Sequence, residues 1–154
     1  MTTDADSTRL RHPVRRVYAL ALLLALGLFY FHVVAILDVA GEILRYEVWL
    51  LNHLGPHGAS RVAILGSFVV LFVAHLVETL AWGMFLRWGR LSPTVLDGFY
   101  YTAASITTLG YGDVVLPQPW RHLGPLVAIS GVLMFGCSTA FLFVVLQTVW
   151  TRHW

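Results

Sequence analysis

Three apolar runs, residues 17–37, 61–86 and 123–149, most constrain what this chain can fold into. Each is long enough to cross a bilayer core of about 30 Å, for which a helix needs roughly 20 residues. The composition agrees, since 58% of the 154 residues are hydrophobic and 12% are charged, whereas soluble domains carry about 25% charged residues. We therefore expect an all-α membrane protein with three transmembrane helices in one domain.

The segments outside these runs are shorter and more polar. Residues 1–16 are basic; such a lead also fits a signal peptide, but the run after it is long, so we expect a retained helix. Residues 38–60 predict an interfacial loop or a short amphipathic helix, closed by the Gly55-Pro56 turn. Residues 150–154 form a tail.

Charge and cysteine content exclude some partners. The basic residues are all Arg, and no basic stretch is interleaved with aromatic residues, so we expect no nucleic-acid partner. The single cysteine, Cys137, lies in an apolar run, where we expect it to be a core residue.

A short glycine-rich stretch separates the second and third runs: Thr107-Thr108-Leu109-Gly110-Tyr111-Gly112-Asp113. Glycine adopts backbone angles that are closed to other residues, so successive carbonyls here can turn to one side. Four copies around an axis would stack rings of oxygen atoms that replace the water shell of a potassium ion.

This stretch resembles the selectivity filter of the potassium channel pore-domain superfamily, whose usual form has Val where this chain has Leu109. The resemblance covers about residues 61–149 and extends to the small bacterial ion channels of that superfamily. It implies a tetrameric pore unit with these parts: outer helix 61–86, re-entrant pore helix 93–106, filter 107–113 and inner helix 123–149.

The resemblance also implies roles for single residues. The backbone carbonyls and one hydroxyl that bind K⁺ belong to Thr108, Leu109, Gly110 and Tyr111. The Leu109 and Tyr111 side chains are expected to point away from the ion path. The residues expected to support the filter are Thr107, Gly112, Asp113, Tyr100, Tyr101 and Glu78.

Gly131 and Gly136 in the third run are candidates for a gating hinge, with Gly131 the first choice by resemblance. Small residues in membrane helices also serve close packing, and this alternative stays open. Ser92 and Pro93 predict the N-cap and first residue of the pore helix.

Glu78 is included among the residues expected to support the filter because the chain departs from the family pattern. Many members carry a Glu in the pore helix where this chain has Ala104. Our hypothesis is that Glu78, in the second run, supplies the buried carboxylate and bonds Ser105, Thr102 or the filter backbone. The alternative is that Glu78 pairs with His75, one helical turn away, and helps the helices pack.

The resemblance implies passive, K⁺-selective conduction through a homotetramer in a bilayer, with no enzymatic activity and no cofactor other than K⁺ ions in the filter. We expect no small-molecule substrate and a location in the bacterial inner (plasma) membrane. One alternative is a membrane metal-binding or enzyme site using His75 and Glu78, with help from His32, His53 or His57. Another is a non-conducting channel-like subunit, because Leu109 is bulkier than the usual Val.

The arginine distribution conflicts with the expected orientation. A pore loop on the extracellular side, with three spans, places the N-terminus outside. The arginines then expected outside are Arg9, Arg11, Arg15, Arg16, Arg87, Arg90 and Arg121, against Arg45, Arg61 and Arg152 inside. This distribution contradicts the positive-inside rule, so the orientation stays open.

Overall fold

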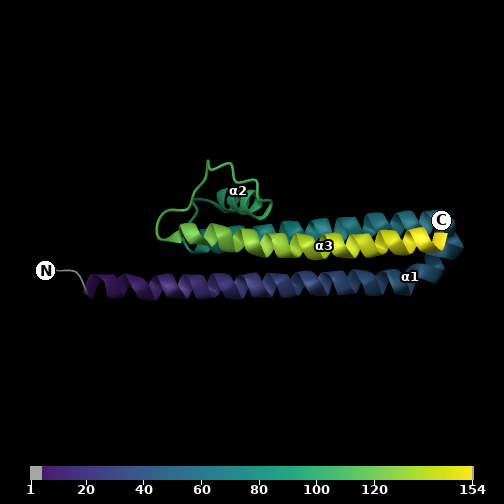
Figure 1. Ribbon diagram of the computed structural model, residues 1–154, viewed down its shortest axis with the longest axis horizontal. Helices are drawn as coiled ribbons and strands as arrows, with labels where there is room; N and C mark the ends of the chain where they lie inside the picture. Colours follow the sequence, from purple (N-terminus) through teal and green to yellow (C-terminus); the bar gives the residue numbers. More distant parts are fainter. Residues whose placement is uncertain (1–4, 154) are drawn as a thin grey trace. The chain divides into compact units, whose positions relative to one another are not determined.

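The computed structural model describes the backbone of residues 5–153 and the side chains of residues 14–151. Its elements, in chain order, are α1 (Ala5–Trp88), α2 (Val95–Ile106), the 3-10 turn η1 (Trp120–His122) and α3 (Leu123–His153) (Figure 1). No strand occurs between residues 5 and 153, so the described chain is all-α. Of the predicted basic segment and tail, residues 1–4 and 154 lie outside the described residues.

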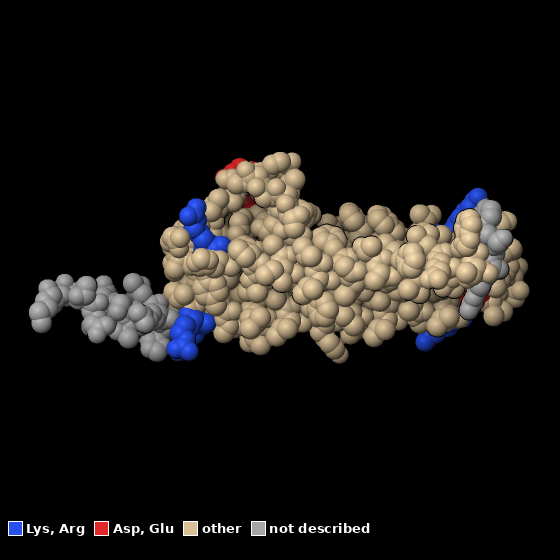
Figure 2. Space-filling model, viewed as in Figure 1, with Lys and Arg blue, Asp and Glu red and all other residues tan. Residues whose placement is uncertain are grey.

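Two helical stretches, Val14–Trp88 and Trp120–Thr151, are long and apolar enough to cross a membrane. Large apolar side chains are exposed along both, including Leu23, Leu65 and Phe143. The face seen in Figure 2 carries almost no charged residue along these helices. Helices that are apolar on all sides need lipid or other protein around them rather than water.

The described chain forms two compact units. The filter unit consists of the described residues up to Phe29 together with Glu78–Val132. The hairpin unit consists of Tyr30–Val77 together with the described residues from Leu133 onward. Each unit therefore combines part of α1 with part of α3.

In the hairpin unit, α1 doubles back at Gly55 (Figure 1). Gly55 is the one residue inside α1 with non-helical backbone angles, φ 67° and ψ 175°. Glycine reaches this positive φ without a steric penalty, and the following Pro56 lacks the N–H needed to continue the helix. The predicted Gly-Pro turn is confirmed. The segment from residue 38 to residue 54 continues α1 without a break and forms no separate element.

The core of the filter unit is made of the last turns of α1 and the first turns of α3. Trp82, Leu86, Leu123 and Val127 are fully buried there. Ala21 and Ala25, from the beginning of α1, are also buried.

The helix α2 begins two residues later than expected, and its cap is different. The N-cap is Thr94, so the prediction of Ser92 and Pro93 at the helix start is wrong. Thr94 Oγ1 accepts a hydrogen bond from the Asp97 N–H at 3.0 Å and donates one to Asp97 Oδ2 at 2.7 Å. This reciprocal pairing satisfies a free N–H of the first turn, and the Asp97 carboxylate also lies at the positive end of the helix. The Ser92 hydroxyl instead donates to the Thr94 carbonyl.

Candidate functional site

The predicted filter residues form an extended loop that leaves the end of α2 (Figure 1). The loop stays attached to the helix through two backbone hydrogen bonds, from Thr108 N to Ser105 O and from Gly110 N to Ala104 O, each 3.0 Å long. Residues 107–115 are all exposed in the single chain. The helix end therefore fixes where the loop starts and leaves the loop itself uncovered.

Every second residue of the loop, from Thr108 to Gly112, has a left-handed backbone conformation. Gly110 and Gly112 have φ of 52° and 80°, which glycine adopts readily. Thr108 has φ of 58°, and a β-branched residue held there is strained by about 1–3 kcal/mol. Among the described residues, no backbone N–H donates to the carbonyls of residues 108–111. These oxygen atoms are therefore available to a ligand.

Tyr100 connects α2 to the far end of the loop. Its hydroxyl donates a hydrogen bond of 2.6 Å to Asp113 Oδ2, and Asp113 Oδ1 accepts from the Val114 N–H at 3.0 Å. The Tyr100 bond lowers the pKa of Asp113 below its ordinary value near 3.8, and the same bond raises the pKa of Tyr100 above 10. The pair is therefore an ionised carboxylate and a neutral phenol throughout the neutral range.

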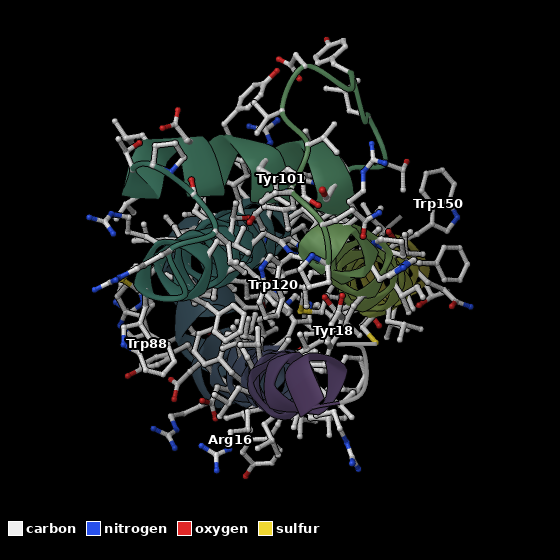
Figure 3. All side chains as sticks on the ribbon, turned by 90° about the vertical axis from the view of Figure 1, so that its left-hand side faces the viewer. Arg16, Tyr18, Trp88, Tyr101, Trp120 and Trp150 are labelled. Atoms are coloured by element: carbon white, nitrogen blue, oxygen red, sulfur yellow. The ribbon has the colours of Figure 1, made fainter. Side chains whose placement is uncertain are left out.

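Tyr101 lies on a different face of α2 and is buried (Figure 3). Burial raises the pKa of the Tyr101 hydroxyl, and the nearby Ser105 side chain opposes this with a smaller lowering effect. A Cβ on Gly124, at the start of α3, would lie 2.6 Å from the Tyr101 hydroxyl oxygen. Of the two tyrosines expected to support the filter, Tyr100 thus holds the loop and Tyr101 packs α2 against α3. A cavity of about 190 Å³ lies behind the loop, with both rings and Arg121 in its lining.

Glycines let α2 approach both neighbouring helices closely. A Cβ on Gly131 of α3 would lie 2.4 Å from Ile106 Cβ and 2.8 Å from Ile106 Cα. Gly131 therefore packs against the last residue of α2, directly before the predicted filter. A Cβ on Gly136 would meet nothing within 4 Å. The hinge role of these two glycines stays a prediction, and Gly131 has a packing role besides.

Two glycines that the sequence analysis did not single out form a second close contact. A Cβ on Gly83 of α1 would lie 2.8 Å from Phe99 N, and a Cβ on Gly98 of α2 would lie 2.7 Å from Gly83 O. The sequence signal that could have indicated this contact is a glycine inside an apolar run, because small residues let membrane helices approach closely.

Glu78 is fully buried in the filter unit, as the hypothesis of a buried carboxylate requires. Thr102 Oγ1 is also buried and has no hydrogen-bond partner, so the expected bond between Thr102 and Glu78 is wrong. The role of Glu78 in supporting the filter stays a prediction.

Comparison with known proteins identifies the family. A family model described as "Ion channel" matches residues 67–148, which is more than half of the chain. The chain belongs to the ion channel family. The channel is also 32% identical over 76 residues to the hyperpolarization-activated voltage-gated potassium channel of Methanocaldococcus jannaschii. The aligned part covers 47% of this chain and 34% of that relative, so the chain spans about a third of the relative's length. No solved structure matches the channel.

The family match places the chain among ion-channel membrane proteins. It contains α2, the glycine-rich loop, Glu78 and both candidate hinge glycines. It leaves out most of α1, from Ala5 to Gly66. The resemblance stated from the seven-residue motif is therefore confirmed at the level of the superfamily.

The histidines of the channel's hairpin unit form a polar cluster in an apolar setting. Ser138 Oγ lies 2.8 Å from His32 Nε2 and 3.1 Å from His75 Nε2, and the two rings are 4.8 Å apart between centroids. His75 also packs against Phe135, with 4.3 Å between ring centroids. The Ser138 hydroxyl has one proton, so it donates to one ring and accepts from the other. The cluster connects both arms of α1 to α3 inside the hairpin unit.

The other histidine pair considered as a metal site lies near the Gly55 turn. His53 Nδ1 is 2.8 Å from the Trp49 carbonyl, and the two rings stack with centroids 4.5 Å apart. His57 lies beyond the break in α1, so the two histidines are not on one uninterrupted helix as their i, i+4 spacing suggests.

Proposed function

We propose that this channel conducts K⁺ passively and selectively through a pore formed by four copies of the chain. The proposal rests on the loop at residues 107–113. Backbone hydrogen bonds attach the beginning of this loop to the end of α2, and the hydrogen bond between Tyr100 and Asp113 holds its far end. A loop fixed at both ends keeps its carbonyl oxygens at defined positions, as ion coordination requires.

The proposed ligands are the carbonyls of Thr108, Leu109, Gly110 and Tyr111, with the Thr108 hydroxyl as the innermost ring. Four similar sets of carbonyl dipoles around one axis replace the hydration shell of a K⁺ ion. The C-terminal end of α2 points its partial negative charge toward the same place and favours a cation. The matched relative is described as a potassium channel, which agrees with this choice of ion.

The exposure of the loop supports assembly. Leu109 and Tyr111 are 54% and 70% exposed in the single chain. At membrane depth, non-helical backbone is tolerated only where other protein encloses it or water fills the space. A neighbouring copy would cover these side chains from behind while their carbonyls face the shared axis.

We propose three membrane crossings, two in α1 and one in α3. The helix α1 has 84 residues, far more than the roughly 20 that one crossing needs, and it reverses at Gly55. Tyr18, near the start of α1, contacts Pro119 just after the loop, and two crossings between them would bring both residues to the same side of the membrane. The conduction mechanism is the same whichever side of the bacterial plasma membrane the filter faces.

The two rival functions are less well supported. In the metal or enzyme hypothesis, His75 and Glu78 are ligands, whereas the matched family consists of ion channels. A non-conducting channel-like subunit differs from the proposed channel only in the absence of flux, so one experiment separates them.

The experiment is ion flux into proteoliposomes that contain the purified chain, under opposed K⁺ and Na⁺ gradients. We expect K⁺ flux that Ba²⁺ blocks. Gly110→Ala should abolish it, because alanine is strained at the φ of 52° that this position needs. Gly66→Ala, in α1, is the matched control, since a Cβ there meets nothing within 4 Å.

Cross-linking of the same preparation should give a tetramer. A tetramer with equal Na⁺ and K⁺ flux would contradict K⁺ selectivity, and a tetramer without flux would favour the non-conducting subunit. A monomer would contradict the proposed pore.

A further inference from the structure

The beginning of α1 lies outside the family match yet touches the loop that follows the filter. In the filter unit, the Tyr18 hydroxyl donates a hydrogen bond of 2.9 Å to the Pro119 carbonyl. The Tyr18 ring also stacks on Trp120, with 6.2 Å between centroids and 27° between planes (Figure 3). The contact joins residues that are 101 positions apart in the sequence.

The Tyr18 contact is one of several that hold the segment between the filter and α3, residues 113–120, here called the outer loop. At the filter end, Tyr100 holds Asp113. In the middle, Leu116 is buried, and at the far end Trp120 N donates to Pro117 O at 2.8 Å. Tyr18, in α1, contacts Pro119 and Trp120 at this far end. The exposed filter is therefore followed by a short loop whose two ends are bound to different helices.

We propose that Tyr18 is a positioning residue for the filter, so that the first helix acts as an external brace on the pore. The inference rests on the proposed function of the filter. Tyr18 does not touch the ion path; it acts through Pro119 and Trp120 on the segment that leads back to Asp113. Without this anchor the outer loop moves more, and the filter loses its conducting arrangement more often.

The variant that isolates the hydrogen bond is Tyr18→Phe, which keeps the ring on Trp120 and removes the hydroxyl. The matched control is Tyr30→Phe, in the same helix, where the side chain is 72% exposed. A neutral hydrogen bond of this kind changes an equilibrium by roughly fivefold. Tyr18→Ala removes the stacking as well and should have a larger effect.

Two readouts are measured on the tetramer in lipid. The first is backbone amide exchange over residues 113–120, which should become about fivefold faster in Tyr18→Phe and stay unchanged in Tyr30→Phe. The second is the K⁺ over Na⁺ permeability ratio together with the decay of current at low K⁺ on the filter side of the membrane. We expect a lower ratio and faster decay in Tyr18→Phe alone.

The outcomes separate this inference from the function it rests on. Wild-type protein without K⁺ flux would contradict the proposed function, whereas unchanged amide exchange in Tyr18→Phe would overturn the anchoring contact by itself. Faster exchange with unchanged permeability and decay would overturn the positioning role. The inference is supported only if exchange and filter behaviour change together.

Discussion

The contact between Gly131 and Ile106 gives the sharpest test of how the filter is supported. Substituting Gly131 with Ala adds one carbon atom to α3. In the present packing this atom would lie 2.4 Å from Ile106 Cβ and 2.8 Å from both its Cα and its Cγ2. Contacts this short do not occur, so either α3 or the end of α2 must move.

The size of the effect follows from a comparison within the same helix. Gly→Ala in a helix interior stabilises by about 1 kcal/mol through backbone propensity, and this gain is common to Gly131→Ala and Gly136→Ala. Only Gly131→Ala adds a steric conflict, since Gly136 has open space. Forcing an extra carbon into a packed contact costs about 1–3 kcal/mol. The difference between the two variants therefore measures the packing alone.

The assay is thermal unfolding of the purified tetramer, with K⁺ flux measured on the same samples. A chain of this size loses about 2–4 °C of melting temperature per kcal/mol, so a 2 kcal/mol difference lowers Gly131→Ala by roughly 4–8 °C relative to Gly136→Ala. Flux should fall in Gly131→Ala, because Ile106 is followed directly by Thr107 and Thr108 of the filter. Equal melting temperatures in both variants would refute the packing argument.

Further predictions follow from other contacts. Gly83→Ala places a Cβ 2.8 Å from a backbone nitrogen of α2 and should destabilise by about 1–3 kcal/mol relative to Gly66→Ala, where nothing lies within 4 Å; equal unfolding curves would contradict this. Ser138→Ala removes a bond from two histidine rings and should cost about 1–3 kcal/mol, measured against Thr139→Val in denaturant unfolding; a neutral result would mean that the cluster does not hold the hairpin unit. Tyr100→Phe should lower the melting temperature by the same amount at every pH from 5 to 9. The folded pKa of Asp113 is lowered, so its contribution is present above about 3.8 and lost as pH falls through the folded value. That of Tyr100 is raised, so its contribution is fully present below about 10 and lost as pH rises through the folded value. A wild-type advantage that disappears between pH 5 and 7 would contradict the assigned pair.

The helices were predictable from the sequence, and so was the turn between the two arms of α1. Apolar runs of more than 20 residues have few alternatives to helix in a membrane, and Gly55-Pro56 is a strong local stop signal. The start of α2 was missed because Ser92 and Thr94 both offer a hydroxyl. The deciding signal was Asp97, three residues after Thr94, which completes a reciprocal cap with that residue alone.

Contacts between distant parts of the chain were not predictable from local patterns. A glycine in an apolar run indicates a close approach but not the partner, so neither Gly83 with Gly98 nor Gly131 with Ile106 follows from the sequence. The bond from Tyr18 to Pro119 bridges 101 positions and depends on how the helices pack. Tyr100 and Asp113 came from the family resemblance, and the structure adds that a hydroxyl and a carboxylate form the contact.

The central claim, K⁺ selectivity through this filter, is tested most directly by the reversal potential of single channels in a planar bilayer with K⁺ on one side and Na⁺ on the other. The account predicts a reversal potential displaced far from zero, in the direction expected when K⁺ alone carries the current. It predicts no current from Gly110→Ala under the same conditions. A wild-type reversal potential near zero would contradict the account, because it would mean that the carbonyls of residues 108–111 do not select K⁺ over Na⁺.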